Sequence, residues 1–188
     1  FENPQRFGGS DVMNRISYDA QHEGELQRAV VAAINREIRA MCRQLDCSRR
    51  TIYEVVVAGN STMRDLLFKL SVQSIGQRPY KSLVEEAWRN GTRSDTALLD
   101  NAWRLGFRVH PKARAYGLPL IASHVGGDMA ADLIAADIAF GSDEIVMLVD
   151  VGTNTEVAIA QGRRMIVASC PAGPAFEGAG VVAGMRAT

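Results

Sequence analysis

Apolar residues recur along this chain at two spacings, one typical of helices and one typical of strands. Ser10 or Asp11 can cap a short helix that reaches Tyr18. Residues 55–58 are continuously apolar, as in a strand that is covered on both faces. Between these segments, residues 25–46 carry apolar side chains at helical spacing and predict a long helix with one buried face: Leu26, Val30, Ile34, Ile38, Met41 and Leu45. This alternation of helix and strand predicts an α/β fold with a mainly parallel sheet flanked by helices.

The pattern is less regular from the end of this strand onward. Residues 59–62 are polar or glycine and predict a turn. Asn60 or Ser61 can cap a helix over residues 63–70. Residues 71–117 contain both tryptophans, two prolines and mixed charges, and we interpret them as a partly helical insertion.

A glycine pair and an alanine-rich segment mark the next helix. We expect the sheet to resume at residues 118–123, after which Gly126 and Gly127 lead into a helix over residues 128–140. Small side chains keep the surface of such a helix thin, so another part of the backbone can approach it closely. Asp128 stands at its beginning, where the helix dipole favours an acid whether or not that acid has a function.

Three short strands follow. Residues 145–149 form an apolar strand that ends on Asp150. Residues 156–160 and 165–169 repeat the strand pattern, and turn residues separate all three segments. The spacing predicts an antiparallel three-stranded meander.

The first turn of this meander has the composition of a phosphate-binding loop. Gly152 lets the backbone approach a ligand closely, and the amides and hydroxyl of Thr153 and Asn154 can donate to phosphate oxygens. Asp150 can hold a magnesium ion, directly or through water. An ordinary hairpin with turn-forming residues is the alternative.

Composition narrows the class of protein. The 188 residues are 47% hydrophobic and 22% charged, as in a globular protein. Lys and Arg together number 21, as do Asp and Glu, and this balance argues against a nucleic-acid partner. No apolar run reaches membrane-spanning length, so we expect no membrane contact. The odd count of three cysteines suits a reducing compartment, and we expect a cytoplasmic protein.

Five sequence blocks, in this order, carry a resemblance to a known family: ENPQRFGGSDVMNRISY, VVAGNSTM, LIASHVGGDMAADLIAADI, DVGTNTE and ASCPAGPAFEGAG. Together they resemble the reductive activators of corrinoid proteins. The DVGTN segment alone resembles the second phosphate loop of a wider ATPase superfamily that includes acetate and sugar kinases, heat-shock protein 70 and actin. The resemblance implies ATP-dependent reduction of a corrinoid protein from cobalt(II) to cobalt(I), in support of a methyltransferase system.

The same resemblance implies the architecture. It is an actin-like ATPase (ribonuclease H-like) fold of two lobes, with residues 1–140 in the first lobe and residues 141–188 beginning the second. Relatives carry a ferredoxin-like domain, a first phosphate loop and adenosine-binding glycines that do not occur in this sequence. We therefore expect an α/β fold that is incomplete at both ends, no iron–sulfur cluster in this chain, and negligible ATP affinity for the chain by itself.

The resemblance also implies a site for ATP and Mg²⁺. Asp150 is the expected metal ligand, and Asp128 is the expected catalytic acid that orients water or the metal. The expected nucleotide contacts, besides Asp150, are Asn60, Ser61, Thr62, Gly126, Gly127, Gly152, Thr153, Asn154, Gly173, Glu177 and Gly178. For residues 60–62, a strand that ends in a helix cap is an equally good interpretation.

Two other functions fit the same fold. One is a small-molecule kinase of the superfamily, although the first and last of the five blocks favour the activator. The other is a non-enzymatic module that only docks a partner.

Overall fold

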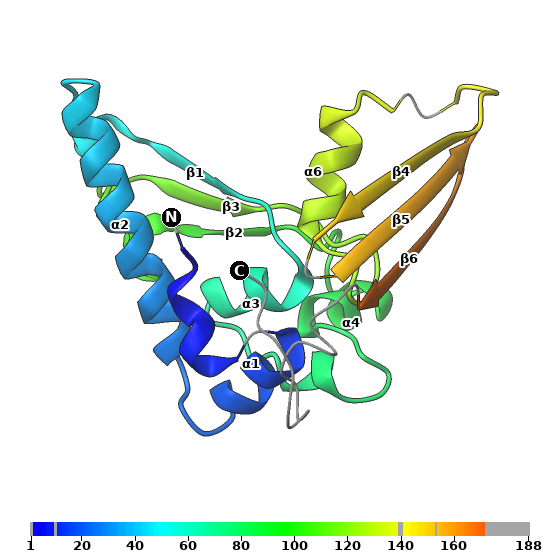
Figure 1. Ribbon diagram of the computed structural model, residues 1–188, viewed down its shortest axis with the longest axis horizontal. Coiled ribbons are helices and arrows are strands. Elements are labelled where there is room, and N and C mark those ends of the chain that lie inside the picture. Colours follow the sequence, from blue (N-terminus) through cyan, green and yellow to red (C-terminus); the bar gives the residue numbers. More distant parts are fainter. Residues whose placement is uncertain (1, 10, 139–140, 153, 172–188) are drawn as a thin grey trace.

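The computed structural model describes residues 2–9, 11–138, 141–152 and 154–171 (Figure 1). Its helices are α1 (Val12–Asp19), α2 (Glu25–Gln44), α3 (Ser61–Leu67), α4 (Leu83–Arg89), α5 (Ala102–Leu105) and α6 (Gly127–Ala135). Its strands are β1 (Glu54–Val57), β2 (Leu98–Asn101), β3 (Arg114–Gly117), β4 (Val146–Val151), β5 (Asn154–Gln161) and β6 (Arg164–Pro171). Short 3₁₀ helices occupy Pro4–Gly8, Arg49–Thr51 and Gln73–Gly76.

The predicted helices are confirmed, with small shifts at their ends. The side chain of Asp11 caps α1 by accepting a hydrogen bond from the Asn14 amide at 2.9 Å. The long helix α2 begins at the predicted residue and buries Leu26 and Val31. Helix α6 is shorter than predicted. It ends at Ala135, and Asp137 then takes a left-handed conformation with φ of 49°, which no continuing helix can contain.

The first sheet has the order β1-β3-β2, with β1 parallel and β2 antiparallel to β3. The sequence-based expectation of a mainly parallel sheet is therefore wrong. The segment interpreted as an insertion, residues 71–117, supplies β2 and β3, including the central strand. Residues 118–123 do not resume the sheet, and only an isolated bridge joins Ala122 to Val125.

One face of this sheet packs against α2 and α3. Their shared core contains Val31, Leu67, Phe68, Leu105, Phe107 and Ala115. Strand β1 lies at the sheet's edge, and Val56 on it is 61% exposed. The prediction that β1 is covered on both faces is thus wrong for the described residues.

The predicted meander is confirmed as the sheet β4-β5-β6, with both pairs antiparallel. Helix α6 lies beside β4, between the two sheets (Figure 1). Met129 and Leu133 of α6 pack with Val125 and Ala158 in a small core. Because residues paired across strands share a face, this packing turns one face of the meander toward α6. Among the described residues, no helix is long and apolar enough to cross a membrane.

Candidate functional site

The beginning of α6 is seated directly on the beginning of α3. The backbone amides of Gly127 and Asp128 donate to the carbonyl oxygen of Gly59 at 2.9 and 3.2 Å. A Cβ atom at Gly126 would lie 2.5 Å from Cα of Asn60 and 2.6 Å from the backbone nitrogen of Ser61. Only glycine fits at this distance, so the predicted close approach of backbone to the glycine pair is observed.

The structure places Asn60, Ser61 and Thr62 at this contact and gives two of them internal partners. Oδ1 of Asn60 accepts from the Met63 amide at 2.9 Å and caps α3. The Ser61 hydroxyl donates to the carbonyl oxygen of Ser123 at 2.5 Å. The Thr62 hydroxyl is buried and has no hydrogen-bond partner within the described part of the chain. The helix-cap interpretation therefore describes Asn60 correctly.

Four carboxylates gather where α6 meets the meander. Asp128 and Asp132 are four residues apart on α6 and so share a side of the helix. Asp150 on β4 is paired directly with Glu156 on β5, which puts both side chains on the same face of the sheet. Sequence reasoning identified Asp128 and Asp150 but missed Asp132 and Glu156. The four-residue spacing and the acid that ends DVGTNTE were the available signals.

The electrostatics of this carboxylate cluster are unfavourable without a cation. Burial raises the pKa of Asp128, Asp132 and Glu156, and the charge of Asp150 raises each of them further. Glu156 is only 3% exposed, and the Ser169 hydroxyl donates to it at 2.7 Å. Like charges in a partly buried site repel one another, so the cluster favours a bound cation or proton.

Removing one of these charges should stabilise the fold. A carboxyl whose pKa is higher in the folded than in the unfolded chain destabilises the fold when it is ionised, and that cost is relieved as the pH falls through the folded pKa. We expect Glu156→Gln, which keeps an acceptor for Ser169, to raise the melting temperature at pH 7 by about 2–4 °C, the shift that about 1 kcal/mol produces in a chain of this size.

Thermal denaturation between pH 4 and 8 measures this effect, and the difference from wild type should shrink toward acidic pH. Glu144→Gln, at an exposed glutamate just before β4, is the matched control and should change nothing. A Glu156→Gln variant that is less stable at every pH would show that favourable contacts outweigh the repulsion.

The cluster does not form a ready-made metal cage. Within the described residues, no group of three or more His, Cys, Asp or Glu side chains is arranged to hold a metal ion. Mg²⁺ does not require such a cage, because it keeps several waters and commonly binds one or two carboxylates together with substrate phosphates. The donors present therefore fit a magnesium ion that is shared with a phosphate.

The turn between β4 and β5 lies one residue beyond Asp150, because β4 ends at Val151. Gly152 is exposed, and its amide donates to the Asn154 carbonyl oxygen at 2.9 Å, so this amide is engaged within the turn. Asn154 begins β5 and is half-buried. Thr153, Gly173, Glu177 and Gly178 lie outside the described residues.

The sequence of nearly the whole chain matches two family models. Residues 1–140 match the RACo middle region. Residues 144–188 match the C-terminal domain of RACo, the ASKHA domain. This chain belongs to the RACo family. The ASKHA assignment also agrees with the predicted actin-like ATPase class and with the mixed α/β structure.

Similar proteins with names agree with this assignment. The corrinoid activation enzyme RamQ of Eubacterium limosum is 30% identical over 99% of this chain. The [Co(II) methylated amine-specific corrinoid protein] reductase of Methanosarcina barkeri is 27% identical over 96% of it. The solved structure of a reductive activator for corrinoid, iron–sulfur protein superposes with a TM-score of 0.81 at 33% identity over 99% of this chain. The chain spans 30% and 32% of the two curated relatives and 28% of the solved chain.

Proposed function

We propose that this chain is part of an ATP-dependent activator that reduces a corrinoid protein of a methyltransferase system from cobalt(II) to cobalt(I). The observation that carries the proposal is the family match, which extends over residues 1–140 and 144–188. The two curated relatives are named for corrinoid activation and for reduction of a Co(II) corrinoid protein. The convergence of carboxylates beside a glycine-containing turn supports a nucleotide site in the same protein.

We propose ATP and Mg²⁺ as the ligands of this site. Asp150 is the proposed metal ligand, beside the proposed phosphate loop Gly152, Thr153 and Asn154. Mg²⁺ supplies positive charge that neutralises phosphate oxygens, and Asp150 and Glu156 already place negative charge on that side of the meander. Gly173, Glu177 and Gly178 remain proposed contacts of the same lobe.

The opposite side of the proposed site is formed where Gly126 contacts the backbone of Asn60 and Ser61. There the beginnings of α3 and α6 place Asn60, Ser61 and Thr62 next to Gly126 and Gly127. Asp128 follows at once and is the proposed acid that orients and deprotonates water. Burial raises its pKa, which makes it a better proton acceptor than an ordinary aspartate.

We further propose that residues 1–140 and 141–188 belong to two lobes, which approach one another when ATP binds across α6. This movement would change the contacts with the corrinoid partner. It would thereby make an energetically unfavourable electron transfer to cobalt(II) possible. The electron would come from an iron–sulfur cluster in another domain of the complete protein. Three free thiols, Cys42, Cys47 and Cys170, agree with a cytoplasmic location.

A spectroscopic assay tests the proposed function. The complete protein, a cobalt(II) corrinoid protein and a low-potential one-electron reductant should yield the cobalt(I) absorption spectrum when ATP and Mg²⁺ are added. ADP and inorganic phosphate should appear together with it. A non-hydrolysable ATP analogue should not support turnover. Transfer of the γ-phosphate to a small molecule, without any cobalt(I), would instead identify a kinase.

A further inference from the structure

A single serine connects two buried side chains to the beginning of α6. Ser123 lies in the tight turn between Ala122 and Val125 and has φ of 46°, in the left-handed region. Its carbonyl oxygen accepts from the hydroxyl of Ser61, and its amide donates to Oε2 of Glu85 at 2.9 Å. Ser61 and Glu85 are 1% and 2% exposed. Ser123 thus has a sterically disfavoured backbone conformation, and buried side chains from α3 and α4 hold both its carbonyl oxygen and its amide.

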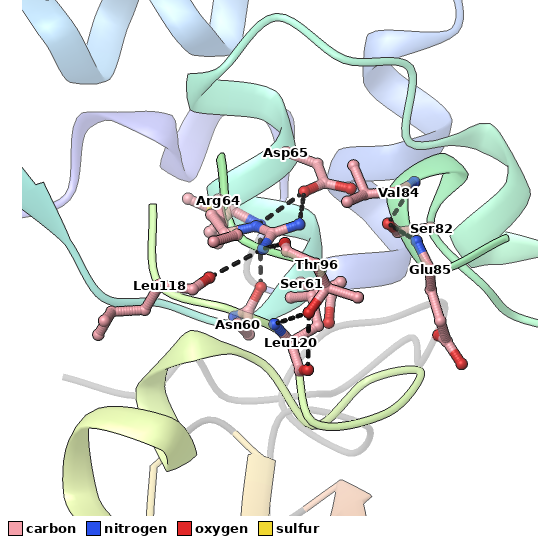
Figure 2. Close-up of polar contacts among 12 residues, drawn as sticks. Asn60, Ser61, Arg64, Asp65, Ser82, Val84, Glu85, Thr96, Leu118 and Leu120 are labelled. Carbon is pink, nitrogen blue, oxygen red and sulfur yellow. Dashed lines mark hydrogen bonds and ion pairs between the residues drawn. The ribbon is translucent and has the colours of Figure 1, made fainter. Parts of the chain in front are cut away.

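The segment before Ser123 is anchored in the same way (Figure 2). The guanidinium of Arg64, which is fully buried, forms an ion pair with Asp65 at 2.7 Å. Its Nη1 also donates to the carbonyl oxygens of Thr96 and Leu118 at 2.7 and 2.8 Å. The Thr96 hydroxyl in turn exchanges hydrogen bonds with both backbone groups of Leu120. Polar side chains therefore fix residues 118–123 along their length.

The segment after Ser123 leads directly into the carboxylate cluster. Val125 donates to the Ala122 carbonyl at 2.7 Å and packs with Met129 against the meander. Gly126 and Gly127 then seat α6 on α3, and Asp128 follows. A change in the Ser123 turn would therefore shift α6 at its first residues, where Asp128 faces the charges of Asp150 and Glu156.

We infer that Glu85 and Ser61 are positioning residues that hold Ser123 in its left-handed conformation and thereby set the place of Asp128 relative to Asp150 and Glu156. This role does not require the Ser61 hydroxyl or the Glu85 carboxylate to contact the substrate. Glu85 is suited to it because an ionised carboxylate makes a stronger hydrogen bond to a backbone amide than a neutral acceptor does. The expected effect of these two residues on catalysis rests on the proposed ATP-dependent function. Their expected effect on the Ser123 turn and the beginning of α6 does not.

Kinetics of the complete protein test the catalytic consequence. Glu85→Ala should lower kcat for ATP-dependent activation by about tenfold to 100-fold, while KM for ATP stays within about threefold. Glu85→Gln keeps an acceptor for the Ser123 amide and should recover most of the rate. Glu86→Ala, at the exposed neighbouring glutamate on α4, is the matched control and should match wild type.

A second-site change makes the test specific to the turn. Glycine adopts positive φ without steric cost, so adding Ser123→Gly to Glu85→Ala should restore part of the lost kcat. Failure of both Ser123→Gly and Glu85→Gln to restore kcat would overturn the inference.

Amide hydrogen exchange separates this inference from the proposed function. In Glu85→Ala and Ser61→Ala, the amides of Val125, Gly127 and Asp128 should exchange faster than in wild type, while those in the middle of α2 should not. This result would support the turn's role even if the wild-type protein did not activate any corrinoid protein. Unchanged exchange at these amides, or an equal increase throughout α2, would contradict it.

Discussion

Replacing Asp150 with alanine in the complete protein should abolish ATP-dependent corrinoid activation and leave the fold intact. Asp150 is the penultimate residue of β4, two positions before the exposed Gly152, and is paired with Glu156 on β5. Its removal takes one negative charge out of the carboxylate cluster, so the folded state loses repulsion rather than a favourable partner. Loss of a metal ligand removes several kcal/mol of charge stabilisation, and the expected fall in rate is at least about 100-fold.

Steady-state rates of ATP hydrolysis and of cobalt(I) formation measure this effect, with circular dichroism to confirm folding. Asp143→Ala removes an exposed acid just before β4 and is the matched control. It should retain the wild-type rates. If the Asp150→Ala protein hydrolysed ATP and activated its partner at wild-type rates, Asp150 would not be a functional metal ligand.

The elements that could be predicted from the sequence are those with many local repeats of one pattern. Helix α2 buries Leu26 and packs Val30, Ile34 and Ile38 against the core, and this apolar spacing is visible without any partner. The same spacing also predicted that Met41 and Leu45 are buried, and this is wrong, because they are 51% and 75% exposed. The meander has three adjacent strands with short turns, so neighbouring segments pair with each other. In both cases the information needed to form the element lies close by in the sequence.

The first sheet could not be predicted in the same way because its pairing is long-range. Strand β3 reads Arg-Ala-Tyr-Gly and pairs with β1, 60 positions earlier in the register Glu54↔Arg114. Strand β2 reads Leu-Leu-Asp-Asn and runs directly into α5. Neither four-residue segment shows an alternation long enough to separate a strand from a loop, so tertiary contacts decide both.

Two residues of the candidate site could be predicted because each stands near the end of an element. Asp128 lies at the beginning of α6, and Asp150 lies near the end of β4. Glu156 lies opposite Asp150 because β4 pairs with β5, as the local strand pattern predicts. Asp132 becomes relevant only because α6 packs on the meander, which no local pattern specifies. The link from Glu85 to Ser123 depends on a contact between residues 38 positions apart.

Replacing Gly126 with alanine should destabilise the protein and slow activation. The added Cβ would lie 2.5 Å from Cα, 2.7 Å from the carbonyl carbon of Asn60 and 2.6 Å from the Ser61 amide nitrogen. These are backbone atoms, so no side chain can rotate away and α6 must move off α3. Overpacking of this kind costs about 1–3 kcal/mol.

The position of Gly59 supplies the control for this change, because it lies in the same contact. A Cβ there would meet no atom within 4 Å, so Gly59→Ala should keep wild-type stability and leave the Gly59 carbonyl in place for Gly127 and Asp128. Urea denaturation of both variants measures the cost, and the activation rate of the complete protein measures the displacement of Asp128. If the two variants behaved alike, backbone contact at Gly126 would not be what positions α6.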